Sequence, residues 1–438
     1  MILKPTYHIL AGSIRNAIAL SAMILIGMSA DSGIGVAMAA DRTAVYAPDF
    51  RSLQVYPEGN YYAPPIVSLG APSDRITVSF DEIADSRSYL RYRLVHCDAM
   101  WRPDGLLENE YLRGFNEANI DTYDFSQGTN INYVHYSLTV PNENMEYTLS
   151  GNYLIQVYNE DDPDTTLLQA AFSVTENTIE LGAGVTSRTD FDYNGHHQQL
   201  DIEADFKKAS TLNNPYTDLA VTISQNGRID NEVMLRAPSR AGGGKASYQH
   251  LPELVFPAGN EYRRMECVST LYPGMKVESI EYAEPFYHII VGGDESRDGQ
   301  TYLYDQTQFG RFTVRNSNTN DSDTEADYVM VHFTLYSPRL KDVDVFLDGD
   351  FTQRRFDPES LMVYNAAYQA YEKTLMLKQG AYNYQYLTVP HGSMKGDTSP
   401  MEGDYYQTVN EYLIKAYYRV PGERYDRLGG ATVVYSGK

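Results

Sequence analysis

The stretch Leu200-Asp201-Ile202-Glu203-Ala204-Asp205-Phe206-Lys207 alternates apolar and charged residues at every position. Because successive side chains of a β-strand point to opposite faces, this pattern predicts a strand that buries one face and exposes the other. The same period of two recurs at residues 76–81, 90–94, 168–175, 329–335, 382–386 and 414–419. Apart from short turns near residues 106–111, nothing between these stretches has the length and period of a typical core helix. The sequence therefore predicts an all-β protein.

The 438 residues exceed what one hydrophobic core usually organises, so we expect three domains. Many short strands at even spacing, with Gly, Pro, Asn and Asp between them, favour tandem immunoglobulin-like β-sandwiches. Asn226-Gly227 is a strong hairpin signal, and the polar stretch 316–327 has the composition of a domain junction or a long loop. We predict an N-terminal β-sandwich at 40–177, a middle β-sandwich at 178–320, and a C-terminal immunoglobulin-like or starch-binding-like β-sandwich at 321–438.

The first forty residues differ from the rest of the chain. Lys4 and Arg15 precede an apolar stretch at 17–28, and Ala37-Met38-Ala39 then offers the small-x-small pattern of a cleavage site. We predict a signal peptide at 1–39 that is cleaved after Ala39. The alternative is an N-terminal membrane anchor, but the apolar run is shorter than the roughly 20 residues that cross a bilayer.

Charge argues against two classes of partner. The chain has 35 basic and 58 acidic residues, which gives a net charge of −23. A field of that sign repels phosphate backbones and anionic lipid headgroups. We therefore expect no nucleic-acid partner, and such acidity would suit a basic protein partner.

The two cysteines, Cys97 and Cys267, lie in different predicted domains. A disulfide between them is therefore less favoured than two buried thiols. Neither cysteine follows the apolar run of the N-terminus, so we expect no lipid anchor.

No motif of the chain carries a convincing catalytic or metal-binding pattern. His96-Cys97-Asp98 contains the residue types of a hydrolytic nucleophile, but neighbours on a strand point to opposite faces, which separates the imidazole from the thiol. His196-His197 has no second ligand pair at zinc spacing. We expect no enzyme activity, no cofactor and no small-molecule substrate.

Two acidic loops, 316–327 and 159–164, loosely resemble calcium loops. In the first, Asp321 occupies the sixth position, where glycine makes the sharp turn, and Asp327 replaces the bidentate Glu at the twelfth. Calcium binding at either loop stays an alternative to a solvated loop. Residues 242–245 lack the spacing of a phosphate loop and read as a flexible turn.

Several motifs are more specific than the strand pattern. In the first predicted domain they are Tyr92-Arg93-Leu94-Val95-His96-Cys97-Asp98-Ala99-Met100-Trp101, Glu110-Tyr111-Leu112-Arg113-Gly114-Phe115-Asn116, Tyr133-Val134-His135-Tyr136, Pro141-Asn142 and Leu149-Ser150-Gly151-Asn152-Tyr153-Leu154. Later motifs are Glu325-Ala326-Asp327-Tyr328-Val329, residues 377–386, and Glu411-Tyr412. Together they resemble the type IX secretion system plug family of the Bacteroidetes. Met100 departs from the family pattern, which has Asp before the tryptophan.

The resemblance implies a non-enzymatic periplasmic protein at the inner face of the outer membrane. It would bind the outer-membrane translocon barrel and close its periplasmic end when no cargo is engaged. Within the motifs we expect Trp101, Glu110, Tyr111, Gly114, Phe115 and Asn116 as candidate partner-binding residues. For Trp101 we favour a core role over an interface role, so that Trp101→Ala would unfold the first domain.

Two other functions stay open. The segment 345–352 and the Tyr-rich strands after it are similar to starch-binding sandwiches, which would make the protein an envelope glycan binder. The end of the chain, 432–438, is also compatible with secreted cargo of the same pathway, whose targeting domain is a small sandwich.

Overall fold

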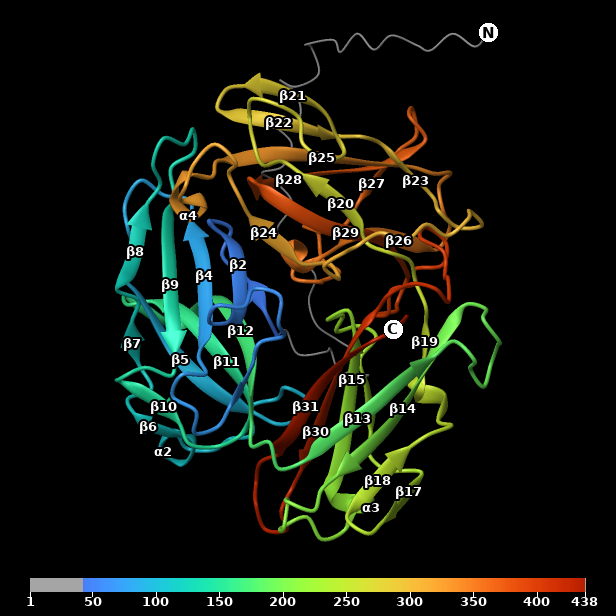
Figure 1. Ribbon diagram of the computed structural model, residues 1–438. Coiled ribbons are helices and arrows are strands. Elements are labelled where there is room, and N and C mark those ends of the chain that lie inside the picture. The colour runs from blue at the N-terminus through green and yellow to red at the C-terminus, as the bar shows by residue number, and fades with distance from the viewer. Residues whose placement is uncertain (1–41, 438) are drawn as a thin grey trace, which may run out of the picture. The chain divides into compact units, whose positions relative to one another are not determined.

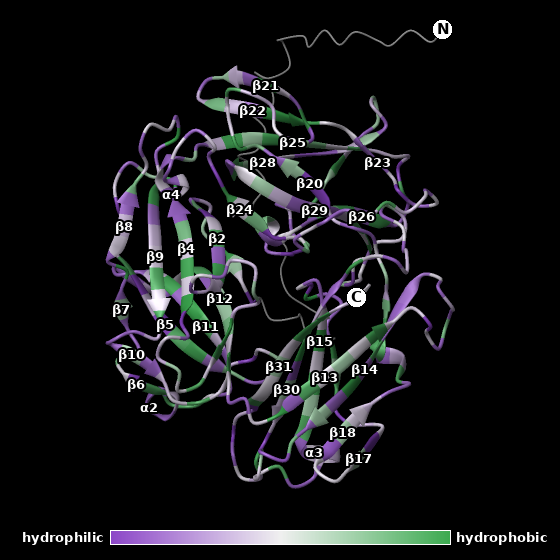
Figure 2. Ribbon diagram, in the orientation of Figure 1, coloured by the Kyte–Doolittle hydropathy of each residue, from purple (hydrophilic) through white to green (hydrophobic). Residues whose placement is uncertain are grey.

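The computed structural model describes residues 42–437, and the prediction of an all-β protein made of several sandwiches is confirmed. Within these residues the strands form seven sheets and the helices are single turns. Figure 2 shows the most hydrophobic residues along the strands and mostly hydrophilic residues in the connecting loops. No helix of the described part could cross a membrane. The predicted signal peptide, with Ala37 and Ala39, lies outside the described residues.

The first sandwich encloses the core that the alternation at 76–81 predicts. Val78 and Phe80 are buried between two sheets, and Phe80 lies opposite Tyr136 in an antiparallel pair. One sheet has the order β2-β4-β9-β8, from Phe50–Pro57, Ile76–Glu82, Val134–Val140 and Thr122–Phe125 (Figure 1). The other has the order β1-β12-β11-β5-β7, from Ala44–Val45, Asp162–Thr175, Gly151–Asn159, Leu90–Cys97 and Ala118–Asn119, with β3 (Ile66–Ser68) parallel to β12. Helix α2 (Glu108–Tyr111) leads into β6 (Leu112–Gly114), which pairs with β10 (Met145–Tyr147).

The second sandwich contains the strand that the opening stretch of sequence predicts. Leu200, Ile202 and Ala204 are buried in its core, and Asn226 and Gly227 both have positive φ in the turn after β15. One sheet joins β13 (Glu180–Thr186), β14 (His197–Asp205), β18 (Lys245–Tyr248) and β17 (Arg240–Gly242), and β19 (Val255–Pro257) also pairs with β14. The other joins β16 (Val233–Leu235), β15 (Leu219–Gln225), β30 (Glu411–Tyr418) and β31 (Arg427–Tyr435). The short helices are α3 (Pro215–Asp218) and η1 (Pro252–Leu254).

The third sandwich is built around the tyrosine-rich strand. Tyr382, Tyr384 and Tyr386 on β29 are fully buried in its core. One sheet joins β20 (Arg263–Glu266), β29 (Gly380–Pro390) and β24 (Phe312–Val314), and β26 (Val343–Asp348) also pairs with β29. The other joins β21 (Val277–Ala283), β22 (Phe286–Val291), β25 (Tyr328–Tyr336), β28 (Ala370–Lys378) and β27 (Val363–Asn365), with β23 (Asp294–Glu295) on β25. The short helices are α4 (Ser322–Glu325) and η2 (Asp350–Thr352).

The sheets do not divide where we expected the boundary between 178–320 and 321–438. Strand β30 pairs with β15, so the end of the chain completes the second sandwich. Strands β20 and β24 pair with β29, so both sides of residue 320 share the third sandwich. The third sandwich is thus inserted into the second. Alternation identifies strands but not their partners, which is why the sequence placed this boundary wrongly.

Candidate functional site

His96 and Cys97 point to opposite faces of β5, as their adjacency predicts. The Nδ1 atom of His96 lies 2.5 Å from a carboxylate oxygen of Asp104, and its Nε2 lies 3.1 Å from the carbonyl oxygen of Ser150. Cys97 instead packs with Trp101 on the outer face of the sheet. Burial raises the pKa of the Cys97 thiol to about 12. A thiol with that pKa is not a nucleophile at neutral pH.

Cys267 behaves in the same way. Both cysteines are free and buried, as expected, and burial also raises the pKa of the Cys267 thiol to about 12. The described residues contain no group of three or more His, Cys, Asp or Glu side chains placed to hold a metal ion. His197 bonds Asp192 at 2.8 Å, and His196 bonds the carbonyl oxygen of Asp404 at 2.8 Å.

The acidic stretch 316–327 joins two sandwiches. The carboxylate of Asp327 accepts hydrogen bonds from the backbone N–H groups of Asn130 and Ile131, at 3.0 and 3.2 Å. From the first sandwich, the hydroxyl of Tyr133 donates to the carbonyl oxygen of Ala326 at 2.8 Å. The polar composition that suggested a junction therefore belongs to a contact between the first and third sandwiches.

A buried ion pair reinforces this contact. Lys378 Nζ lies 2.6 Å from the carboxylate of Asp81, and both side chains are 1% exposed. Tyr328 donates its hydroxyl to the same carboxylate at 2.6 Å, and His135 Nδ1 lies 2.6 Å from it. The ammonium also lies 4.1 Å from the centre of the Tyr133 ring. Burial would raise the pKa of Asp81, but Lys378 and His135 lower it.

Sequence reasoning did not identify this cluster as a unit. Tyr133, His135, Tyr328 and Lys378 all belong to the motifs that resemble the plug family, and the fold brings those motifs together. Asp81 follows the buried Phe80 on the polar face of β4, where alternation predicts contact with water.

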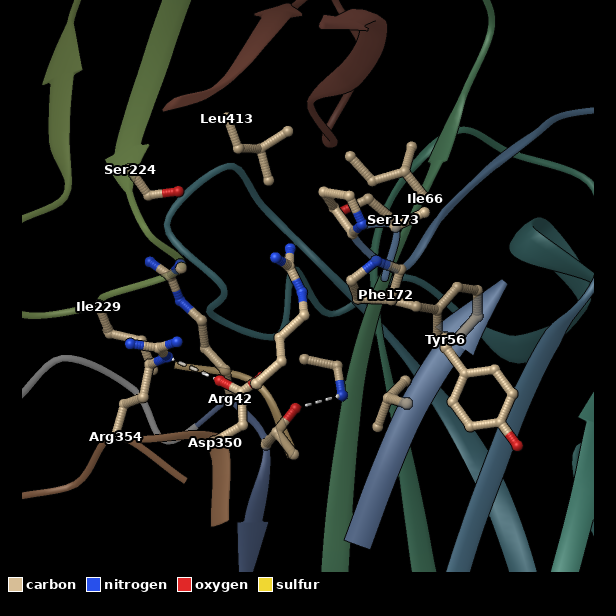
Figure 3. Close-up of a pocket in the computed structure, with 18 of the residues that line it drawn as sticks. Arg42, Tyr56, Ile66, Phe172, Ser173, Ser224, Ile229, Asp350, Arg354 and Leu413 are labelled. Carbon is tan, nitrogen blue, oxygen red and sulfur yellow. Dashed lines mark hydrogen bonds and ion pairs between the residues drawn. The ribbon is translucent and has the colours of Figure 1, made fainter. Parts of the chain in front are cut away.

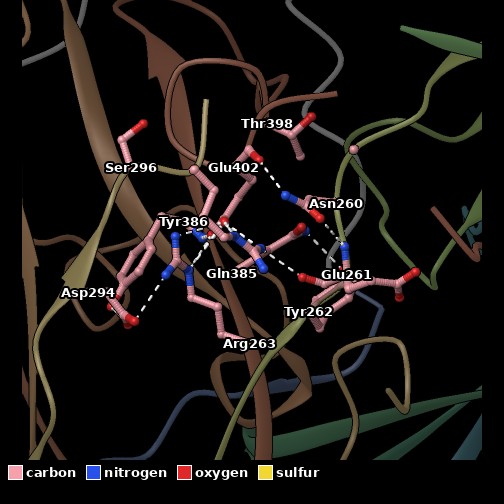
Figure 4. A network of polar contacts seen from close by, with 12 residues as sticks. Asn260, Glu261, Tyr262, Arg263, Asp294, Ser296, Gln385, Tyr386, Thr398 and Glu402 are labelled. Atoms are coloured by element: carbon pink, nitrogen blue, oxygen red, sulfur yellow. Dashed lines mark hydrogen bonds and ion pairs between the residues drawn. The ribbon is translucent and has the colours of Figure 1, made fainter. Parts of the chain in front are cut away.

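A second network fixes the two crossings between the second and third sandwiches (Figure 4). Glu402 is fully buried and accepts hydrogen bonds from Arg263 at 3.0 Å and Arg297 at 2.7 Å. Arg263 also bonds Asp294 at 3.0 Å, and Asn260 donates to the carbonyl oxygen of Glu402 at 2.7 Å. Burial would raise the pKa of Glu402, but the two guanidinium groups lower it. Since Asn260 and Glu402 lie on opposite crossings, the network ties them together.

Two candidate partner-binding residues are structural. The amide of Asn116 accepts the backbone N–H of Leu94 at 2.8 Å and donates to its carbonyl oxygen at 2.9 Å. The hydroxyl of Tyr111 donates to the same carbonyl oxygen at 3.0 Å. Both side chains are buried, so they hold the 110–116 segment against β5.

The backbone at Gly114 places the apolar side chain of Phe115 in solvent. Gly114 has φ +104°, and a Cβ atom there would lie 2.1 Å from the carbonyl oxygen of Asn144. The next side chain, Phe115, is 79% exposed. Glu110, also exposed, accepts hydrogen bonds from Arg424 of the second sandwich at 2.5 and 2.7 Å. Phe115 is therefore the one candidate that offers a large apolar group to a partner.

Trp101 is buried, but not in the main core of the first sandwich. Its ring packs with Cys97 and Leu154 in a small cluster on the outer face of the sheet. The guanidinium of Arg42 lies 5.1 Å from the ring centre, and the ammonium of Lys415 on β30 lies 4.8 Å from it. Trp101 thus fills the contact between the first and second sandwiches, which differs from the core role that we expected.

A cavity of about 230 Å³ lies beside Trp101 and is lined by all three sandwiches. Figure 3 shows Arg354 and Asp350 on one side of it and Phe172 and Tyr56 on another. Three ion pairs border the cavity: Arg42 with Glu232 at 2.7 Å, Arg311 with Glu411 at 2.6 Å, and Arg354 with Asp350 at 2.7 Å.

Known proteins give one strong likeness over most of the chain and one over its first sandwich. Residues 50–176 match the family model described as the type 9 secretion system plug protein 1st domain. A crystal structure of a hypothetical protein from Parabacteroides merdae ATCC 43184 is 44% identical, with a TM-score of 0.88, and the match covers 90% of this chain and 99% of that one.

Two weaker structural matches carry no argument. Pseudomonas fluorescens alkylpurine DNA glycosylase AlkC is 13% identical, over 29% of this chain and 30% of that one. Escherichia coli alpha-2-macroglobulin is 9% identical, over 89% of this chain and 35% of that one. The TM-score is 0.18 for both. No curated protein matches the chain.

Proposed function

Because this chain belongs to the type 9 secretion system plug protein family, we propose that it binds and seals the periplasmic end of the system's outer-membrane translocon barrel. It would act in the periplasm, held peripherally against the inner face of the outer membrane and without catalysis. A pore wide enough for folded cargo leaks small solutes when idle, and a body with a footprint larger than the opening stops that leak.

The observation that carries the proposal is how firmly the three sandwiches are joined. The second sandwich is assembled from two separate stretches with the third inserted between them, so a hinge motion must bend two crossings at once. Lys378 and Asp81 join the first sandwich to the third in a buried ion pair, and removing one partner of such a pair costs about 3–5 kcal/mol. A body joined in this way resists deformation at an opening.

Phe115 is our candidate anchor for the barrel. Large aromatic side chains are enriched among the residues that contribute most to protein interfaces. Gly114 sets the backbone next to it, while Tyr111 and Asn116 hold the segment from below. Tyr111, Gly114 and Asn116 would thus act by positioning Phe115.

Affinity purification from solubilised outer membranes tests the proposal. The wild-type protein should recover a very large barrel protein, and Phe115→Ala should reduce the recovery at least about tenfold while the protein stays folded. The matched control is Phe191→Ala, which removes a 65% exposed phenylalanine from the second sandwich. Deleting the gene should let small solutes leak through intact outer membranes. A purification that recovers no barrel from wild-type cells contradicts the proposal.

Neither alternative function gains support from the fold. The tyrosines of β29 that suggested glycan binding are in the core, where they cannot stack on a sugar. The end of the chain forms β31, which pairs along β30 inside the second sandwich, so residues 432–437 are not a separate targeting domain. Cell fractionation distinguishes cargo from plug, because cargo reaches the cell surface or the medium.

A further inference from the structure

One cation of the central cavity forms no ion pair, although the Glu232 carboxylate, which is itself paired with Arg42, attracts it. Lys415, on β30, is 4% exposed and lines the cavity. Within residues 42–437 its Nζ makes no hydrogen bond or ion pair, and its closest aromatic neighbours are the rings of Trp101, at 4.8 Å, and Tyr417, at 5.5 Å. A buried ammonium without an acceptor is costly. Accordingly, burial lowers the pKa of Lys415 to about 8.

The other buried cations of the described chain all have carboxylate partners. Arg228 pairs with Asp230, Arg354 with Asp348 and Asp350, and Lys378 with Asp81. Lys415 is therefore an exception to a rule that the rest of the molecule follows.

The ion pairs around the cavity engage every lining cation except Lys415, and Arg354 also pairs with Asp348 behind the lining. Four cationic side chains line the cavity, and three carboxylates do. Each of the three arginines among them is engaged with one of those carboxylates, as the ion pairs above describe. Among the cations that line the cavity, Lys415 is therefore the one without an ion pair.

A second donor at the same place is also unsatisfied. The indole Nε1–H of Trp101 is buried and has no acceptor, and Trp101 lines the cavity together with Lys415. A buried indole N–H normally has a partner, because leaving it unpaired costs free energy. The wall next to Lys415 thus leaves a polar group without an acceptor, although the indole nitrogen itself has almost no surface open to the cavity.

The size and walls of the cavity restrict what could supply that acceptor. An engineered cavity of about 150 Å³ holds benzene, so about 230 Å³ holds roughly nine non-hydrogen atoms. Much of the wall is apolar. Its apolar side chains include Leu53, Val55, Ile66, Phe172, Ile229 and Leu413.

We propose that the cavity binds a small monoanionic carboxylate with an apolar tail, its oxygens accepting a hydrogen bond from Lys415 Nζ. A phosphate fits less well, because it favours bidentate arginine contacts and the arginines here are already paired. The carboxylate belongs either to a free acid or to the C-terminal end of a peptide. This inference stands apart from the plug function and holds or fails independently of it.

Benzoate and benzamide form the direct test, since they share size and shape but differ in charge. Calorimetry and thermal unfolding of residues 40–438 should show benzoate binding at least about tenfold more tightly than benzamide. Lys415→Met, which keeps the aliphatic stem, should abolish that preference. The control Lys341→Met, at an exposed lysine, should retain it.

A tripeptide ending in phenylalanine, with a free or an amidated carboxyl end, identifies the source. Binding of the free-ended tripeptide but not benzoate assigns the site to chain ends, while binding of benzoate assigns it to free acids. Should Lys415→Met fail to fold, the wild-type protein still gives an answer, because benzoate should raise the pKa of Lys415 in an NMR titration. The proposal would be overturned if benzoate and benzamide bind equally tightly, if the probe that binds leaves the pKa of Lys415 unmoved, or if no probe binds.

Discussion

Replacing Lys378 with methionine tests how the first sandwich is held to the third. The ammonium lies 2.6 Å from the Asp81 carboxylate with both groups 1% exposed, so the variant leaves a buried carboxylate without its cation. Such a loss costs about 3–5 kcal/mol in the free energy of unfolding.

The matched variants separate this pair from its surroundings. Lys208→Met, at an exposed lysine, should stay within about 0.5 kcal/mol of wild type. The double variant Asp81→Asn with Lys378→Met should lose less than the sum of the two single variants, because neither charge is then left alone.

Urea unfolding followed by circular dichroism, with limited proteolysis of the junction, measures these changes. The lowered pKa of Asp81 adds a pH signature: ionised Asp81 stabilises the wild type fully above about pH 4, and this contribution is lost as the pH falls through the lowered pKa. The reasoning would be refuted if the free energy of unfolding of Lys378→Met lies within about 1 kcal/mol of the wild-type value at pH 8. A buried carboxylate that has lost its cation should cost more than that.

Three further predictions concern single side chains. Trp101→Ala should cost about 3–5 kcal/mol and increase proteolysis between the first and second sandwiches, yet leave the first core folded, because Trp101 packs outside that core. Gly114→Ala should cost more than about 1 kcal/mol, because its Cβ meets the Asn144 carbonyl oxygen, whereas Gly182→Ala, which meets open space, should cost less; urea titration compares them. Cys97 and Cys267 should react with a thiol reagent at pH 8 only after unfolding, since both are buried with pKa values raised to about 12; fast reaction in the folded state would contradict this.

The alternating stretches predicted strands well, because burial of one face requires an apolar residue at every second position. Leu200, Ile202 and Ala204 are in the core, as their spacing predicts, and so are Val78 and Phe80. Which strands pair with each other is not encoded in this alternation. For that reason the return of β30 to β15 across the inserted third sandwich could not be predicted, and the boundary near residue 320 was wrong.

The polar faces of the strands explain what sequence reasoning missed at the candidate sites. Asp81 and Lys415 each alternate with buried apolar residues, so both were expected in water. Instead, another sandwich covers Asp81, and Lys415 lies in the contact beside Trp101. The family motifs did include Lys378 and Tyr328, but only the fold reveals that they meet Asp81.

Joining sandwiches through polar faces has a physical consequence for their assembly. Each sandwich keeps most of its apolar residues in its own core, while a small cluster of Ala99, Tyr417 and Leu428 spans the first and second sandwiches. Each core can therefore form before the neighbouring sandwiches dock. The contacts between sandwiches must then satisfy every charge that they bury, because an unpaired one costs several kcal/mol. Asp81, Glu232 and Glu402 meet this requirement with cations from across a junction or a crossing. Lys415 is the exception among these buried charges, and the carboxylate proposed for the cavity would supply its ion-pair partner.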